Sequence, residues 1–243
     1  MRRYLIVAFT LLLALTANAQ TSATSSNMMI VPRDVDTNQF GAGFQSNLVE
    51  ALWEDAIGCP TNARTFLFNP VTGGGTASTY TDPACTTGER SGDRSNFGFL
   101  MSKVGPTANL AAAVGEVINE SGKFLTELGY DIRKGSHCGA GAPRFNVTLQ
   151  DGQFFFIGCN SPPPTATTPG EGWDRRRWGN KADGVPVPAF DKNGVLTTIP
   201  TNVRLRSIIV VFDEGQDVGP DFTGHAFLDN IDISGVLIGK PIR

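Results

Sequence analysis

The stretch CGAGAPRFNVTLQDGQFFFIGC, residues 138–159, contains two arms of alternating apolar and polar residues around an Asp151-Gly152 step. Alternation with a period of two is typical of a strand with one buried face. Asp-Gly is a favoured turn between two paired strands. The pattern therefore predicts a β-hairpin with arms at 144–149 and 153–158.

Strand signals of the same kind fill the C-terminal half of the chain. The run VRLRSIIVVF at 203–212 is rich in β-branched residues, which favour strands, and a last strand is predicted within HAFLDNIDISGVLIG at 225–239. In NLAAAVGEVINESGKFLTELGYDIRKG, three glycines and alternation in the second half argue against one long helix and predict two strands, 110–118 and 123–133. GWDRRRWGN at 172–180 predicts a further short strand.

The composition agrees with these signals. Among 243 residues there are 28 glycines, 15 prolines and only 4 methionines, which favours short strands joined by many turns in an all-β sandwich or barrel. No linker divides residues 40–243, so we expect one domain. The exception to the β pattern is NLVEALWEDAIGC at 47–59, where helical spacing after the Asn47 cap indicates a short helix near the N-terminus.

The first residues, MRRYLIVAFTLLLALTANAQ, have the features of a secretory signal peptide. Two arginines precede an apolar run that is too short to span a bilayer, which needs about 20 residues, and a small-x-small cleavage site ends at Ala19. We expect residues 1–19 to be removed between Ala19 and Gln20 and the protein to be secreted or periplasmic. Residues 20–39 are expected to form a leader that is partly disordered.

The charge of the chain argues against two classes of partner. Without the two N-terminal arginines, the formal net charge changes from −3 to −5, and no polybasic tract is present. Nucleic-acid affinity depends on neutralising phosphates, and attraction to anionic lipid likewise needs basic residues. We therefore expect neither nucleic-acid binding nor membrane insertion, whereas the oligomeric state is left open.

The four cysteines predict disulfides rather than a metal or redox site. An even number in an exported chain points to disulfides, and a structural zinc site needs two close pairs, which are absent from this sequence. A two-residue turn places Arg144 opposite Cys159, so the flexible segment 139–141 must fold back to bring Cys138 to its partner. The simplest pairing is local: Cys59–Cys85 and Cys138–Cys159.

Acidic residues gather near the C-terminus, and two interpretations remain open. Carboxylates on a loop between two strands are the hard oxygen ligands that Ca²⁺ takes, although their spacing does not fit an EF-hand loop. The alternative is a solvated acidic turn. The residues concerned are Asp213, Glu214, Asp217, Asp221, Asp229 and Asp232.

Asp229 is the most informative of these residues. In AFLDNIDI, simple alternation places Phe227, Asp229, Ile231 and Ile233 on one face of a strand. A carboxylate among apolar neighbours is costly unless a cation or backbone N–H groups compensate its charge. The pattern therefore predicts a compensating partner for Asp229.

AFLDNIDISG on a final strand resembles the closing strand of galactose-binding-like jelly rolls, the fold of many carbohydrate-binding modules. CGAGAPRFNV and VVFDEGQDVGPDFTG are similar to stretches of uncharacterised secreted bacterial proteins of the same kind. The resemblance extends from about Leu125 to Gly239. It implies a jelly-roll β-sandwich, and a structural Ca²⁺ that Asp229 holds together with ligands from near the N-terminus. Only Asp229 is carried over from the resemblance, and Asp34 and Asp36 are the N-terminal candidates that this sequence offers. It implies fold more strongly than activity.

A candidate ligand surface is predicted at 172–180. Sugars stack on aromatic faces with polar groups at the rim, and Trp173, Arg175 and Trp178 supply both kinds of group. The alternative is an edge strand whose tryptophan faces the core and whose arginines pair with the acidic loop.

No catalytic motif stands out in the sequence. The chain has two histidines, His137 and His225, each isolated, and it lacks G-x-S-x-G, H-E-x-x-H and a glycine-rich phosphate loop. A glycosidase needs two carboxylates at a set separation, for which Glu127 and Asp131 on one strand face are a weak candidate. We therefore assign no catalytic residue and do not expect an enzyme.

Taken as a whole, the sequence predicts a secreted, non-catalytic binding module for a glycan or cell-surface polymer, with a structural calcium. The expected metal ligands are Asp213, Asp217, Asp221 and Asp229. The alternatives are a structural or adhesive exoprotein that binds protein partners and, less favoured, a hydrolase that uses carboxylates.

Overall fold

The computed structural model describes residues 28–36, 49–54, 66–69, 74–77, 98–104, 111–139, 141–170, 173–214 and 223–239. Within these ranges all regular secondary structure is β, and there is no helix long and apolar enough to cross a membrane. The predicted signal peptide lies outside the described residues. Within the predicted leader, Met29–Asp36 forms the strand β1.

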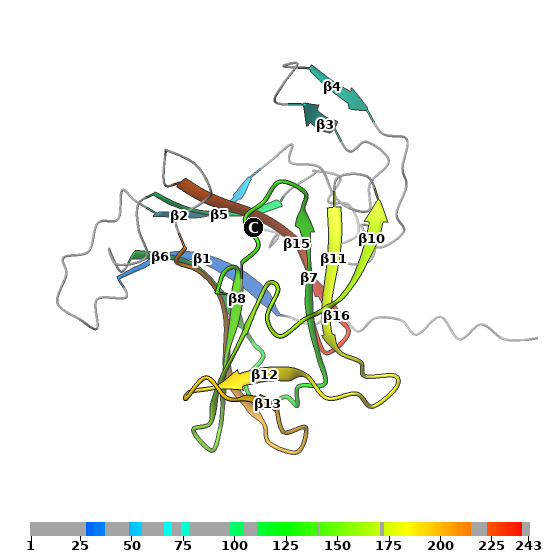
Figure 1. Ribbon diagram of the computed structural model, residues 1–243. Helices are drawn as coiled ribbons and strands as arrows, with labels where there is room; N and C mark the ends of the chain where they lie inside the picture. Colours follow the sequence, from blue (N-terminus) through cyan, green and yellow to red (C-terminus); the bar gives the residue numbers. More distant parts are fainter. Residues whose placement is uncertain are drawn as a thin grey trace, which may run out of the picture.

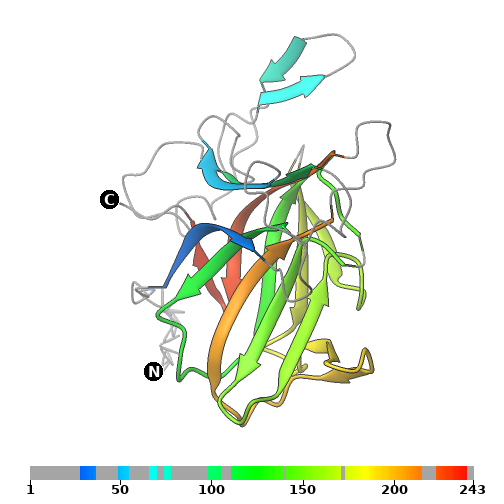
Figure 2. The same cartoon turned by 90° about the vertical axis from the view of Figure 1, so that its left-hand side faces the viewer.

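The strands form two large antiparallel sheets that lie face to face (Figure 1). In sheet A, β14 lies between β6 and β8, as Figure 2 also shows. The strands of sheet A, in spatial order, are β1, β6 (Ala111–Ile118), β14 (Leu205–Phe212), β8 (Arg144–Leu149), β9 (Phe154–Gly158), β12 (Pro188–Asp191) and β13 (Leu196–Thr198).

Sheet B has β15 at its centre, flanked by β7 and β5, and the short strand β16 (Val236–Ile238) pairs with β15 as well. A separate two-stranded sheet is made by β3 (Phe66–Asn69) and β4 (Gly74–Ala77). The strands of sheet B, in spatial order, are β10 (Thr165–Gly170), β11 (Trp173–Gly179), β7 (Glu127–Arg133), β15 (Thr223–Ile233), β5 (Gly98–Val104) and β2 (Val49–Glu54).

The pairing of the strands identifies the winding of the sandwich. β5 pairs with β15 in sheet B, β6 with β14 in sheet A, β7 with β11 in sheet B and β8 with β9 in sheet A. Successive pairs of one long antiparallel ribbon thus alternate between the two sheets, which is the arrangement of an eight-stranded jelly roll. The predicted all-β jelly-roll sandwich is confirmed.

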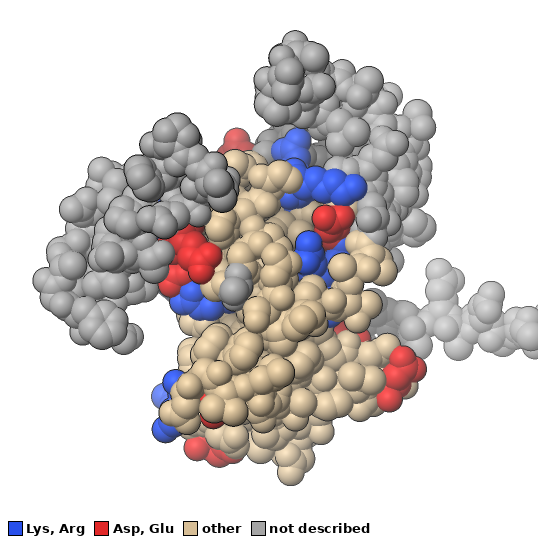
Figure 3. Space-filling model, in the orientation of Figure 1, with Lys and Arg blue, Asp and Glu red and all other residues tan. Residues whose placement is uncertain are grey.

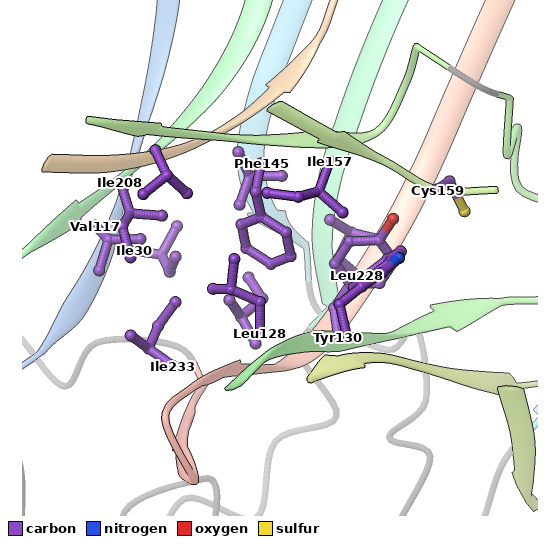
Figure 4. Packing of buried hydrophobic residues seen from close by; sticks show 14 of the residues in the cluster. Ile30, Val117, Leu128, Tyr130, Phe145, Ile157, Cys159, Ile208, Leu228 and Ile233 are labelled. Carbon is purple, nitrogen blue, oxygen red and sulfur yellow. The ribbon is translucent and has the colours of Figure 1, made fainter. Parts of the chain in front are cut away.

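The core lies between the sheets and follows from alternation along each strand. From β8, Phe145 and Val147 are fully buried, and from β7, Leu128 and Tyr130 are too. Figure 4 shows Phe145 beside Leu128 and Tyr130 in the space between the sheets. Burying one such side chain stabilises the folded state by about 1.5–3 kcal/mol relative to leaving it exposed. The alternation seen in the second half of 110–133 corresponds to this core face, since Leu128, Tyr130 and Ile132 are all buried.

The hairpin of β8 and β9 is confirmed, with one correction to its register. Leu149 N donates to the Gln153 carbonyl (2.9 Å), so the loop has three residues rather than two. Gly152 closes this loop with φ 88°, as three-residue hairpin loops require of their last residue. Arg144 therefore lies opposite Gly158 and not opposite Cys159.

The two strands predicted within 110–133 are confirmed as β6 and β7. The turn between them contains two residues with positive φ, Asn119 (64°) and Gly122 (82°). The strands do not pair with each other, because this turn carries the chain from sheet A to sheet B.

The short helix predicted at 47–59 is wrong, because Val49–Glu54 forms the strand β2 at the edge of sheet B. Val49, Ala51 and Trp53 recur with a period of two and pack against the core. Over six residues this period is hard to distinguish from helical spacing, and pairing with β5 along the whole strand decides in favour of β. The remainder of 47–59 lies outside the described residues.

Candidate functional site

The predicted aromatic surface on β11 does not form. Trp173 and Arg175 lie on the outward face of sheet B, whereas Trp178, an odd number of residues further on, points into the core. The exposed fraction is 0% for Trp173 and 1% for Trp178. The alternative interpretation is closer to the structure, since Trp178 fills the core and Arg175 and Arg177 pair with carboxylates. However, β11 is an internal strand between β10 and β7.

Asp229 lies on a different face from the one that simple alternation predicted. Asp229 pairs with Asp131 and Asp232 pairs with Gly129, so the register shifts between them. Asn230 takes up the extra residue with φ 45°, which is the geometry of a β-bulge. Both aspartates therefore lie on the outward face of sheet B.

The bulge also changes the surroundings of the neighbouring apolar residues. Ile231 and Ile233 point into the core and are buried, whereas Phe227 lies outward in contact with the Arg133 guanidinium, 5.6 Å from the ring centre. The prediction that Asp229 shares a face with Ile231 and Ile233 is thus wrong. Its neighbours are polar.

A network of hydrogen bonds surrounds Asp131, the register partner of Asp229, which has no exposed surface. Arg175 donates to both oxygens of this carboxylate, Nε to Oδ1 at 2.8 Å and NH2 to Oδ2 at 2.9 Å. Asn230 Nδ2 donates to Oδ2 at 2.9 Å, and Asn230 N donates to Asp229 Oδ1 at 2.7 Å. Bidentate pairing of this kind is strong and directional.

Arg177 extends the network to Asp232. Its Nε lies 3.2 Å from Asp232 Oδ2 and its NH1 lies 3.6 Å from Asp131 Oδ1. Burial lowers the pKa of the Arg177 guanidinium, and the two aspartates oppose this effect. The side chain crosses directly over Gly129, where an added Cβ would lie 2.2 Å from Arg177 Cδ. The glycine is therefore what lets one guanidinium reach two carboxylates.

The described members of the predicted calcium site are not brought together. Asp213, directly after β14 of sheet A, forms a bidentate ion pair with Arg144, whereas Asp229 lies in β15 of sheet B. Asp34 is exposed on β1 in the other sheet and accepts a hydrogen bond from Ala51 N. Asp217 and Asp221 lie outside the described residues. Among the described ones, no three His, Cys, Asp or Glu side chains form a group suited to a metal ion.

Arg175 and Arg177 place guanidinium groups on Asp131 and Asp232, so these two carboxylates already have cationic partners. His137, in turn, lies 2.9 Å from Glu214 Oε2 through Nε2, packed edge-on against Phe212. Its role is to hold the end of the sandwich together.

The Cys138–Cys159 disulfide is confirmed and is a clamp. The disulfide links the segment that precedes β8 to the residue that follows β9. Asn160 Nδ2 donates to the Cys138 carbonyl and Arg144 NH1 to the Gly141 carbonyl, so that this segment is fixed at three points. Cys59 and Cys85 lie outside the described residues.

Replacing both Cys138 and Cys159 by alanine is expected to lower the free energy of unfolding by about 3 kcal/mol, because the bridge closes a loop of this size in the unfolded chain. Urea unfolding followed by far-ultraviolet circular dichroism measures the change. A reducing agent should then destabilise the wild type more than the double variant. Equal stability of the two proteins would contradict the clamp.

A different surface brings together the groups that sugar binding needs. Outward-facing residues of five neighbouring strands form one row across sheet A, since each is the register partner of the next: Ile209, Asn146, Phe156, Phe190 and Leu196. The rings of Phe156 and Phe190 stack with centroids 5.5 Å apart. Leu196 is 59% exposed and the other four are half-buried.

A second row lies beside the first and adds hydroxyl groups. Ser207 pairs with Thr148, and Thr148 with Phe154, all three half-buried and outward. Arg144 Nε donates to Asn146 Oδ1 (3.1 Å), which orients the amide so that Asn146 presents its NH₂ group as a donor. We call Asn146, Thr148, Phe154, Phe156 and Phe190 the Phe–Asn face.

The Phe–Asn face contains no charged side chain, and Figure 3 shows a mainly uncharged surface over β12 and β13. Sequence reasoning missed this face because β12 joins β9 only through tertiary pairing. The local signal was the triple Phe154-Phe155-Phe156, whose first and third members must point away from the core when the second points into it.

Comparisons with known proteins give a limited result. No family model and no curated protein matches the chain. Two solved structures are similar to it: a family 11 carbohydrate-binding module from Clostridium thermocellum in complex with a β-1,3-1,4-mixed-linked tetrasaccharide (12% identity, TM-score 0.38), and the family 11 module of the cellulosomal cellulase Lic26A-Cel5E of the same organism (12% identity, TM-score 0.34). The first covers 87% of this chain and 97% of its own, the second 88% and 98%.

Proposed function

We propose that this chain is a secreted, non-catalytic binding module whose ligand is an uncharged glycan or cell-surface polymer, bound on the Phe–Asn face. The single observation that carries the proposal is the composition of this face: three phenylalanine rings beside an amide and a hydroxyl, aligned by strand register. Pyranose rings offer C–H groups to aromatic side chains and hydroxyls to polar ones, so that both halves of a sugar are matched. Secretion is inferred from the N-terminal sequence alone.

One of the two carboxylates considered for hydrolysis, Asp131, is already engaged in an ion pair, which argues against a catalytic role for the pair. Glu127 and Asp131 lie on the outward face of the same strand, as expected, but Asp131 is tied to Arg175 on both oxygens. A carboxylate held in this way is a poor general acid or nucleophile, since both lone-pair sets that would engage a substrate already accept hydrogen bonds. The proposal therefore includes no catalytic step.

Replacing Phe156 by alanine is expected to weaken binding to the polysaccharide that the wild type retains best by about tenfold, equivalent to about 1.4 kcal/mol. Phe190→Ala should have a similar effect, because the two rings stack as one unit. The measurement is affinity electrophoresis against a panel of neutral and acidic polysaccharides, followed by isothermal titration with an oligosaccharide of the best one.

Phe124→Ala is the matched control, because Phe124 is 43% exposed and stacks on Arg204 away from this face. It should bind as the wild type does. If no polysaccharide is retained, the glycan proposal fails, and the alternative of a structural or adhesive exoprotein with protein partners takes its place. If the wild type binds a polysaccharide and both Phe156→Ala and Phe190→Ala still bind it as well, the ligand class is right but the Phe–Asn face is not the binding site.

A further inference from the structure

Asn146, within the Phe–Asn face, has a side-chain amide whose orientation is fixed by its neighbour Arg144. The two residues are two positions apart on β8, so both side chains lie on the outward face of sheet A. Arg144 Nε donates to Asn146 Oδ1 at 3.1 Å. Because a guanidinium nitrogen can only donate, the amide oxygen must face Arg144 and the NH₂ group must point elsewhere.

The guanidinium of Arg144 is itself held on its other side. Its NH1 donates to the Gly141 carbonyl at 2.9 Å and to Asp213 Oδ1 at 2.5 Å, and its NH2 donates to Asp213 Oδ2 at 2.7 Å. Gly141 belongs to the segment that the disulfide clamps. With these contacts and the one to Asn146, the guanidinium cannot turn, and the amide keeps its orientation.

The NH₂ group of Asn146 is available to a ligand. Within the ranges that the structure describes, no acceptor forms a hydrogen bond with Asn146 Nδ2. Asn146 is half-buried and faces outward, so a molecule on the surface of sheet A can reach this nitrogen. The Phe–Asn face therefore presents two N–H donors at a fixed place, and a ligand must supply the acceptor.

The two flanks of this donor are apolar. The register partners of Asn146 are Ile209 on β14 and Phe156 on β9, each about 4.8 Å away across the sheet. Ile209 packs against a small apolar cluster on the same outward face, which consists of Ala112, Val114 and Val211. An acceptor bound at Asn146 thus lies between an aliphatic side chain and an aromatic ring.

The charges around Asn146 disfavour a carboxylate as this acceptor. Arg144 is the neighbouring cation, and Asp213 neutralises it. On β6, the strand beyond β14, Glu116 likewise pairs with Arg33. A carboxylate brought to Asn146 would lose hydration without gaining a cationic partner, whereas a neutral carbonyl oxygen accepts the same N–H groups at a lower cost.

We propose that the glycan bound on the Phe–Asn face carries N-acetylated sugars, with the acetamido carbonyl accepting from Asn146 Nδ2 and the acetyl methyl group in contact with Ile209. This inference rests on the proposed function. An acetamido group is neutral and joins a good acceptor to a methyl group, which matches a fixed donor beside an aliphatic side chain. Arg144 is a positioning residue, because it acts on the ligand only through Asn146.

Two oligomers of equal length test this inference on the wild type. One is made of β-1,4-linked N-acetylglucosamine and the other of β-1,4-linked glucose, so they differ only in the acetamido group. Isothermal titration should show at least about tenfold tighter binding of the acetylated oligomer. In saturation-transfer NMR, the acetyl methyl protons should receive more saturation than the protons of the sugar ring.

Three variants separate the donor from its support. Asn146→Asp keeps the size of the side chain but removes the donor, and it should weaken binding of the acetylated oligomer about tenfold or more. Arg144→Lys keeps a charge beside Asp213 but has no fork to hold the amide. It should reduce the preference for the acetylated oligomer, whereas a merely structural role would weaken both oligomers alike. Asn119→Asp, in the exposed turn after β6, is the matched control and should bind as the wild type does.

Two kinds of polymer carry this group, and a further titration distinguishes them. One is an unbranched polymer of N-acetylglucosamine, and the other is the glycan strand of bacterial cell walls, in which alternate units also carry a lactyl carboxylate. Because the Phe–Asn face has no charged side chain, the uncharged oligomer should bind more tightly than a cell-wall strand of equal length.

The possible failures are distinguishable. If the glucose oligomer, or any polysaccharide without acetamido groups, binds as tightly as the acetylated oligomer and Phe156→Ala weakens that binding, this inference is overturned and the proposed function stands. If no glycan binds at all, the proposed function fails together with this inference. Both outcomes are read from proteins with Asn146 and Arg144 intact, so they hold even if the variants at these positions fold poorly.

Discussion

Replacing Asp131 by alanine is expected to lower the free energy of unfolding by about 3–5 kcal/mol, because it leaves buried cationic and amide groups without their shared acceptor. The Asp131 carboxylate has no exposed surface and accepts from Arg175 twice and from Asn230 once. Without it, Arg175 and Arg177, two residues apart on the outward face of β11, have one fewer negative charge between them. Urea unfolding measures the change as a lower midpoint at an unchanged slope.

Two further variants separate the charge of Asp131 from its hydrogen bonds. Asp131→Asn keeps the shape and one acceptor oxygen and should cost less than the alanine. In a double-mutant cycle, Arg175→Ala should destabilise the wild type more than it destabilises Asp131→Ala, since the ion pair is then already broken. Glu50→Ala, on an exposed edge, should change stability by less than about 0.5 kcal/mol. A stability of Asp131→Ala equal to that of the wild type would contradict a closed, desolvated network.

The sequence predicted best where structure depends on neighbours along the chain. The hairpin of β8 and β9, the strand β11 and the inward face of β7 all follow from alternation and turn residues within about ten positions. Even there, the three-residue loop that ends at Gly152 changed the register by one. A turn type depends on how the two strands twist against each other, which the Asp-Gly pair alone does not determine.

Longer-range features were predicted poorly, and Asn230 shows why. One residue in a positive-φ bulge reverses the faces of everything after Asp229 in β15. Alternation cannot reveal it, because the bulge is stabilised by contacts of Asn230 with Asp131, about a hundred positions earlier. A compensating partner was predicted for Asp229, and the backbone N–H of Asn230 donates to its Oδ1. The arginines of β11, whose register against β7 the sequence did not specify, pair with Asp131 and Asp232.

The candidate ligand surface illustrates the same limit. Trp173 and Trp178 were predicted to form one sugar-binding surface because indole rings stack on sugars. A strand, however, places residues five apart on opposite faces. Conversely, Phe156 and Phe190 lie in different hairpins and become neighbours only when β12 joins β9. Residue type is readable from sequence, whereas which residues share a surface is decided by sheet order.

Replacing Trp178 by alanine is expected to lower the free energy of unfolding by about 3–5 kcal/mol, as removal of a fully buried aromatic side chain does. Trp178 is 1% exposed and packs edge-on against Tyr130 and Phe145, with ring centroids 5.5 and 6.2 Å away. Its Nε1 donates to the Pro162 carbonyl at 2.8 Å. The measurement is urea unfolding, as for Asp131.

Two comparisons decide whether Trp178 acts through packing or through ligand contact. Trp178→Phe should cost more than Trp173→Phe, because it leaves the Pro162 carbonyl without its donor, whereas Trp173 Nε1 has no hydrogen-bond partner among the described residues. At a temperature where Trp178→Ala is still folded, its affinity for a polysaccharide should remain within about twofold of the wild type, in contrast to the roughly tenfold loss for Phe156→Ala. A stable Trp178→Ala protein that no longer binds would place the ligand on β11 and remove it from the Phe–Asn face.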